Sequence, residues 1–221
     1  MSTNDSIVVF GRGSSLKRIK ELPKDIKQVI IVNDFSQELE HDFIDEYMKD
    51  KEIIHFKNWC DDAILQDKLH YDKYNVKRIQ VNRNSIYDLA HDQSRYLHLL
   101  IAHHYGMELG FCDKKVNEQG GEYKTAGLHA VGYAVIELKK KNIFMCGIDF
   151  YDSEYLVEKN FEGEHVPITD KRHAYYGKHN ELKTFFLEFS SKFKDINFNL
   201  VTDSEYMNKN VYDNINIINR K

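Results

Sequence analysis

The first segment suited to chemistry is a glycine-containing turn that follows the apolar stretch 7–10. Its residues are Gly11, Arg12, Gly13, Ser14 and Ser15. Glycines after a strand let backbone amides approach a phosphate, and the N-terminus of a following helix adds partial positive charge, so this turn predicts a nucleotide-phosphate site. A dinucleotide fingerprint would need a third glycine at position 16, where the chain has Leu16, and a mononucleotide fits better. A tight strand–helix turn without a ligand is the alternative.

A second segment, residues 172–179, gathers side chains that exchange protons or carry charge. Its residues are Arg172, His173, Ala174, Tyr175, Tyr176, Gly177, Lys178 and His179. Histidine is the side chain best suited to accept a proton near neutral pH, so this segment is a candidate source of a general base. An ordinary solvated loop is the alternative interpretation.

Polar residues also stand at the ends of two predicted strands. Asn33 follows the apolar stretch 29–32, and Asp149 and Tyr151 follow the stretch 143–146. Ligands of doubly wound sheets lie outside the carboxyl ends of the strands, so these side chains are expected near a ligand. The alternatives are an Asx turn at Asn33, a helix cap or a buried partner for Asp149, and simple packing for Tyr151.

The elements that must position these groups alternate between strands and helices. Strands are predicted at 7–10, 29–32, 53–56, 77–81, 143–146 and 198–201. Helices are predicted at 16–22, 37–49, 86–107, 125–139 and 182–193. Ser14 or Ser15 would cap the first of these helices. The alternation indicates an α/β fold with a mostly parallel sheet and helices on both of its faces.

The stretch 152–180 interrupts this alternation, since it holds no clear hydrophobic period and contains Gly163, Pro167 and Gly177. A connection of that length inside a compact domain is usually a functional loop. We therefore predict one domain over residues 1–221, with 152–180 as a lid. The Asn- and Lys-rich tail is expected to fray.

The composition excludes several classes of protein. With 31 Lys and Arg against 35 Asp and Glu, the formal net charge is −4, which argues against nucleic-acid binding driven by bulk charge. No apolar run reaches the ~18 residues of a membrane span, so membrane contact would be peripheral. Three separated cysteines without a CxxC pair indicate neither a zinc site nor a disulfide framework, and they predict reduced thiols in the cytoplasm.

Thr125, Ala126 and Gly127 open a predicted helix, and the strand that follows ends in Gly-Ile-Asp-Phe-Tyr at 147–151. This order resembles the bacterial lipooligosaccharide sialyltransferases (glycosyltransferase family 42), in which Thr-Ser-Gly, a helix and a strand ending in Ser-Gly-Ile-Asp-Phe-Tyr follow one another. Five further motifs of the family are matched less closely, and they occur in the same order. Residues 11–17 match Gly-Asn-Gly-Pro-Ser-Leu-Lys, 33–35 match Asn-Gln-Phe, and 56–58 match Phe-Tyr-Asn. Residues 172–179 match Arg-x-His-Tyr-x-Gly-His, and 187–189 match Leu-Glu-Phe.

The resemblance implies a single Rossmann-like domain of the GT-A type with a lid. It implies an inverting transfer of sialic acid or a related nonulosonic acid from a CMP-sugar to a hydroxyl group of a surface glycan. It implies no metal, no further cofactor, a cytoplasmic location with at most peripheral contact at the inner membrane, and a homo-oligomer by analogy. It assigns the general base to His179 and contacts with the leaving phosphate to Tyr151 and Tyr155. It assigns the donor site to Gly11, Arg12, Gly13, Ser14, Ser15, Asn33, Asn58, Thr125, Ala126, Gly127 and Asp149.

The chain departs from the family pattern at several positions. Arg12 stands where the family has asparagine, Ala126 where it has serine, and Tyr123 where it has arginine. An alignment without gaps places Lys178 at the base position, but a lysine would need strong desolvation to accept a proton, so we favour His179. Two alternatives remain open. They are a glycosyltransferase with a different donor sugar and a nucleotide-binding module without catalytic activity.

Overall fold

The structure is a computed structural model, and it describes residues 5–57, 68–82, 96–112, 125–157, 159–160, 163–164, 167, 169–173, 176–205, 207 and 212–218. Asn58, which the resemblance assigns to the donor site, lies outside these residues, as does Tyr123. Among the helices described, none combines the length and the apolar character needed to cross a membrane.

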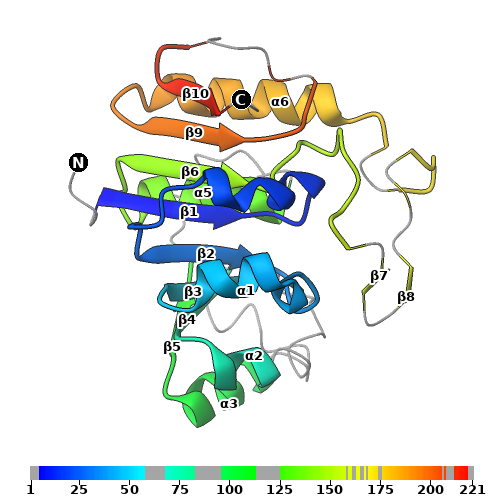
Figure 1. Ribbon diagram of the computed structural model, residues 1–221. Helices are drawn as coiled ribbons and strands as arrows, with labels where there is room; N and C mark the ends of the chain where they lie inside the picture. The colour runs from blue at the N-terminus through cyan, green and yellow to red at the C-terminus, as the bar shows by residue number, and fades with distance from the viewer. Residues whose placement is uncertain are drawn as a thin grey trace.

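Eight parallel strands form one sheet in the order β10-β9-β6-β1-β2-β3-β4-β5 (Figure 1). Their bounds are β1 (Ser6–Phe10), β2 (Gln28–Val32), β3 (Glu52–Lys57), β4 (Val76–Val81), β5 (Glu108–Phe111), β6 (Asn142–Cys146), β9 (Asn197–Val201) and β10 (Ile215–Ile218). A small antiparallel sheet pairs β7 (Lys159–Asn160) with β8 (Gly163–Glu164). The predicted α/β fold with a parallel sheet is confirmed.

Helices cover both faces of the large sheet. Their bounds are η2 (Ser14–Glu21), η3 (Glu38–Glu40), α1 (Asp42–Met48), α2 (Lys68–Lys73), α3 (Tyr96–Tyr105), α5 (Ala126–Ile136) and α6 (His179–Lys192). One face packs against α5 and α6 through a core that includes Val9, Val131 and Phe186. The other face packs against η2 and α1 through a core that includes Phe10 and Leu16. Successive side chains of β1 enter opposite cores, which explains why its sequence is apolar without interruption.

The direction in which successive strands are added to the sheet reverses at β1. From β1 the chain adds β2, β3, β4 and β5 outward on one side, and α5 carries it back to β6, which pairs with β1 on the other side. Phe10 and Cys146 lie in register at the ends of these two strands. Open α/β sheets bind ligands at the carboxyl ends of the strands beside such a reversal.

The structure corrects the sequence analysis at several elements. Strands β5 and β10 and helix α2 were not predicted, and β10 lies in the tail that was expected to fray. The predicted helix 37–49 is divided into η3 and α1. The helix after the glycine turn is a 3-10 helix, and neither Ser14 nor Ser15 caps it, since its N-cap is Gly13, which has no side chain to offer.

Candidate functional site

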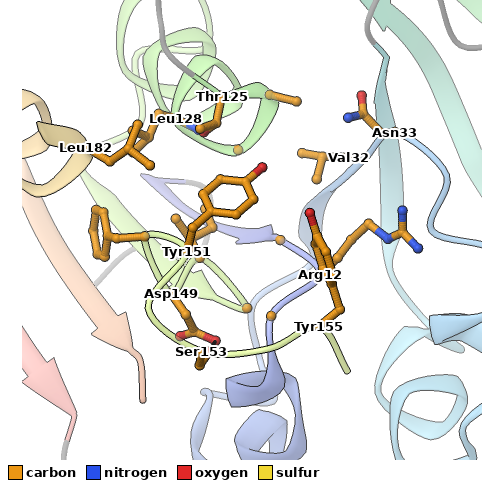
Figure 2. A pocket seen from close by; sticks show the side chains of 17 residues that line it. Arg12, Val32, Asn33, Thr125, Leu128, Asp149, Tyr151, Ser153, Tyr155 and Leu182 are labelled. Carbon is orange, nitrogen blue, oxygen red and sulfur yellow. Dashed lines mark hydrogen bonds between the residues drawn. The ribbon is translucent and has the colours of Figure 1, made fainter. Parts of the chain in front are cut away.

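A cavity lies at the carboxyl ends of β1, β2 and β6, at the reversal in strand order (Figure 2). Its empty space, including the open mouth, is about 700 Å³. The predicted site residues that line it are Gly11, Arg12, Gly13, Asn33, Thr125, Ala126, Gly127, Asp149, Tyr151 and Tyr155. Ser14, Ser15 and His179 are also described by the structure, and they are not part of this lining. The fold thus brings most of the predicted site residues together from distant parts of the sequence.

The backbone amides of the glycine turn donate to protein acceptors. The pairs are Gly11 N to Cys146 O (2.8 Å), Gly13 N to Gly147 O (2.8 Å), Ser14 N to Glu154 O (2.9 Å) and Ser15 N to Asp149 Oδ2 (3.0 Å). An amide engaged in this way reaches a phosphate only by giving up a hydrogen bond inside the protein. All four amides thus have partners within the protein, and the phosphate site at this turn stays a prediction.

The glycines of this turn serve close packing between the ends of β1 and β6. A Cβ atom on Gly11 would lie 2.2 Å from the carbonyl oxygen of Gly147, and one on Gly147 would lie 2.5 Å from the carbonyl oxygen of Gly11. Gly147 also has a φ of 73°, which side-chain-bearing residues rarely adopt. A Cβ on Gly13 would lie 2.3 Å from Oδ2 of Asp149. No side chain fits at these contacts.

Asp149 is the acceptor that ties this region together. Its carboxylate, 4% exposed, accepts hydrogen bonds from Ser15 N (3.0 Å), Ser153 Oγ (2.9 Å), Thr202 Oγ1 (2.8 Å) and Asp203 N (3.2 Å). The bond from Ser15 places a negative charge at the N-terminus of η2, where the helix dipole favours an anion. The interpretation of Asp149 as a helix cap and buried partner is the one that the structure shows.

Arg12, which also lines the cavity, forms a buried ion pair with Glu38. Its Nε donates to Oε1 of Glu38 at 2.7 Å, and the Glu38 side chain is completely buried. Burial disfavours both charges. In Glu38 it prevails over the attraction of Arg12 and raises the pKa of the carboxyl group, whereas in Arg12 the carboxylate prevails and raises the pKa of the guanidinium. The guanidinium carbon also lies 5.8 Å from the ring centre of Tyr155. Glu38 carried no signal in the sequence that would have marked it as part of a site.

A second helix N-terminus borders the cavity, that of α5. Thr125 is its N-cap, and the Thr125 side chain accepts a hydrogen bond from Leu128 N at 3.2 Å. Ala126 and Gly127 form the start of the helix and line the cavity, and the first turn contains no acidic residue. This N-terminus therefore presents its partial positive charge to the cavity with no carboxylate in the first turn of the helix.

Tyr151 and Tyr155 extend from the loop after β6, and Figure 2 shows both hydroxyl groups directed into the cavity. Their ring centres lie 6.3 Å apart, with the ring planes nearly perpendicular. Phe150 and Tyr151 have φ angles of 54° and 57°, and Asn33, which lines the same cavity, has a φ of 51°. Such left-handed backbone is rare outside glycine and is concentrated at functional sites.

His173 lies beside these tyrosines, and the assignment of the base to His179 stays a prediction. Nε2 of His173 lies 3.3 Å from Oη of Tyr155, and its ring centre lies 5.6 Å from that of Tyr151. Burial lowers the pKa of His173 below its ordinary value, and the Glu154 carboxylate opposes this only in part. His179 is the first residue of α6. The composition of the segment indicated a histidine for the site, but it could not say which one.

The segment after Ser153 returns to the glycine turn. Tyr155 forms an antiparallel bridge with Gly13, and Leu156 N donates to Arg12 O at 2.8 Å. The first residues of the predicted lid are therefore held against the loop after β1. Figure 1 shows the β7–β8 hairpin on the side toward which the strands of the sheet point. The lid stays a prediction.

No family model matches the chain, and no curated protein sequence matches it. Among solved structures, the chain is similar to the monofunctional alpha-2,3-sialyltransferase Cst-I from Campylobacter jejuni, with a TM-score of 0.59 and 20% sequence identity. The likeness covers 92% of this chain and 78% of that chain. At this identity it shows a shared fold, and with the parallel sheet it supports a Rossmann-like architecture of the GT-A type.

Proposed function

We propose that this chain is a glycosyltransferase that moves a sugar from a CMP-activated donor to a hydroxyl group of a glycan. The observation that carries the proposal is the convergence of Tyr151, Tyr155 and the N-terminus of α5 around one cavity, with His173 beside Tyr155. This set offers donors to an anion and an acceptor for a proton, which are two requirements of transfer from a sugar phosphate. The fold shared with a sialyltransferase favours the same reaction class.

Each group has a distinct role in this proposal. Negative charge develops on the phosphate oxygen as its bond to the anomeric carbon breaks, and the hydroxyl groups of Tyr151 and Tyr155 donate to that oxygen. The N-terminus of α5 attracts an anionic group of the donor, either the phosphate or a carboxylate of the sugar. Asn33, at the end of β2, is a polar contact for the nucleoside. Neither a metal nor a further cofactor is part of the proposal.

A different donor sugar is the second candidate within the same reaction class. Ala126 gives the α5 N-terminus no side-chain hydroxyl, whereas the sialyltransferases that the sequence resembles have a serine there, which helps to hold the sugar carboxylate. A donor whose sugar lacks a carboxylate would need no such hydroxyl group. This observation concerns the sugar and leaves the proposed CMP site unchanged.

A panel of nucleotides tests the proposal most economically. CMP, UDP, GDP and NAD are added separately, and the stability of the chain is followed by thermal denaturation. A ligand at 100 times its Kd should stabilise the folded chain by about 2.7 kcal/mol, and we expect this for CMP alone. The titration with CMP is repeated in EDTA, where the affinity should be unchanged. Stronger stabilisation by UDP, GDP or NAD than by CMP would contradict the proposal.

A further inference from the structure

The backbone of Asn33 is held by strand β3. Asn33 follows the end of β2, lines the cavity and has a left-handed φ of 51° (Figure 2). Its backbone N donates to Phe56 O at 2.9 Å, and its carbonyl O lies 2.5 Å from Nε2 of His55. The neighbouring strand therefore contacts this residue through both its N–H and its C=O groups.

His55 is a buried imidazole in an otherwise apolar part of β3. It is 1% exposed and lies between Ile54 and Phe56 in the sequence. A carbonyl oxygen only accepts, so the proton of the neutral ring is on Nε2, and this N–H donates to Asn33 O. Nδ1 then accepts from Oη of Tyr71 at 2.9 Å. Both ring nitrogens have partners, as a buried polar side chain requires, and the ring is held in one tautomer.

The tyrosine that fixes this tautomer is itself buried. Tyr71 belongs to α2 and is 6% exposed, and its ring packs edge-on against that of Tyr105 on α3, with the ring centres 5.6 Å apart. The orientation of the His55 N–H toward the loop after β2 is therefore set by contacts away from the cavity.

We propose that His55 is a positioning residue that holds Asn33 in the left-handed conformation in which its side chain faces the cavity. The consequence for the nucleotide rests on the proposed function, in which Asn33 is a polar contact for the nucleoside. Left-handed backbone is unfavourable for a residue with a side chain and persists only where the surroundings impose it. Without the N–H of His55, Asn33 should relax toward ordinary backbone angles and its amide should turn away from the cavity.

The ligand-free chain gives the first test, through two NMR measurements. The imidazole ¹⁵N shifts should show the proton of His55 on Nε2, and the coupling between the amide proton and Hα of Asn33 should report a positive φ. His55→Leu should lose this coupling, whereas His55→Gln should keep it, because the glutamine amide can donate in place of Nε2. A proton on Nδ1, or an unchanged Asn33 coupling in His55→Leu, would overturn the proposal.

Calorimetric titration with CMP gives the second test. His55→Leu should raise the Kd for CMP by about 3- to 10-fold, the effect expected for the loss of one hydrogen bond to the nucleoside. His55→Gln should restore the affinity. Tyr47→Phe is the matched control, since it removes another buried hydrogen bond, from Tyr47 Oη to Pro23 O at 3.0 Å, and it should leave the Kd unchanged.

A double-mutant cycle separates positioning from a general structural role. Asn33→Gly removes the side chain but accepts a positive φ freely, so it should weaken CMP binding by itself. His55→Leu should cause no further loss in the Asn33→Gly chain, because it acts through the side chain that is already absent. Equal losses from His55→Leu with and without the Asn33 side chain would show that His55 supports the fold in general, and would overturn the proposal.

The two tests also distinguish this proposal from the proposed function. If the unaltered chain does not bind CMP, the proposed function fails, and the NMR measurements alone then decide whether His55 holds Asn33. If the chain binds CMP and His55→Leu leaves both the Asn33 coupling and the Kd unchanged, the proposed function stands and the positioning role is wrong.

Discussion

Two helix N-termini border the cavity, and they differ in what stands in front of them. At η2 the Asp149 carboxylate accepts from Ser15 N and occupies the position of an anion. At α5 the N-cap Thr125 is followed by Ala126 and Gly127, and no carboxylate lies in the first turn. In the sequence, the glycine turn before η2 is the more conspicuous candidate for a phosphate site. The comparison teaches that glycines in a turn indicate that another group approaches the backbone closely. Here that group is the loop after β6.

The largest expected effect comes from removing the carboxylate of Asp149 from the N-terminus of η2. Asp149→Ala should lower the free energy of unfolding by about 4 kcal/mol, because several buried donors lose their acceptor at ~1–3 kcal/mol each. The matched control is Asp195→Ala, since Asp195 is exposed and pairs with the exposed Lys141 at the surface. The control should change stability by about 0.5 kcal/mol or less. Urea denaturation measures both, and equal losses would show that Asp149 does not organise η2.

Two glycine substitutions test the difference in packing between the glycine turn and the start of α5. Gly11→Ala places a Cβ 2.2 Å from a backbone oxygen of Gly147, and it should destabilise the fold by about 3 kcal/mol. Gly127→Ala meets its nearest neighbour, a side-chain atom of Ile148, at 3.4 Å and should be neutral or stabilise α5 by up to ~1 kcal/mol. Chemical denaturation of the two variants decides the matter. A Gly11→Ala variant as stable as the unaltered chain would contradict the close packing of the β1 and β6 loops.

A charge placed at the second N-terminus should act on binding and spare the fold. Ala126→Asp puts a carboxylate where the anionic donor is proposed to bind, and it should weaken the binding of a non-hydrolysable CMP-sugar by about 5- to 30-fold, or ~1–2 kcal/mol. The same carboxylate favours the helix dipole of α5, so thermal stability should hold or rise slightly. Ser14→Ala, outside the cavity, is the control and should leave the affinity unchanged. Calorimetry measures both affinities. Equal affinities in the two variants would contradict the binding of the anionic group at the N-terminus of α5.

The sequence predicted the strands that lie at the centre of the sheet, because burial on both faces requires apolar residues throughout. Ile7, Val8 and Val9 of β1 show this pattern, and all three are fully buried. The edge strands β5 and β10 escaped prediction. Each is four residues long and includes polar or small residues, as edges tolerate, so neither stands out from a loop.

The site was predictable in its location and less so in its chemistry. The carboxyl ends of β1, β2 and β6 follow from strand order, and the cavity is there. Residues far away in the sequence, such as Gly147 and Glu154, accept hydrogen bonds from amides of the glycine turn. No local sequence pattern shows which of these amides remain available to a ligand. The choice between His173 and His179 likewise depends on how one turn folds back to Tyr155.

The central claim is that the donor's anionic group lies at α5 and the tyrosines, and not at the glycine turn. The most direct test is a titration of the ¹⁵N-labelled chain with a non-hydrolysable CMP-sugar, followed through the backbone amide resonances. The account predicts the largest changes at Ala126 and Gly127, with small changes at Ser14 and Ser15, whose amides keep their partners in the protein. The largest changes at Ser14 and Ser15, with α5 unaffected, would contradict it.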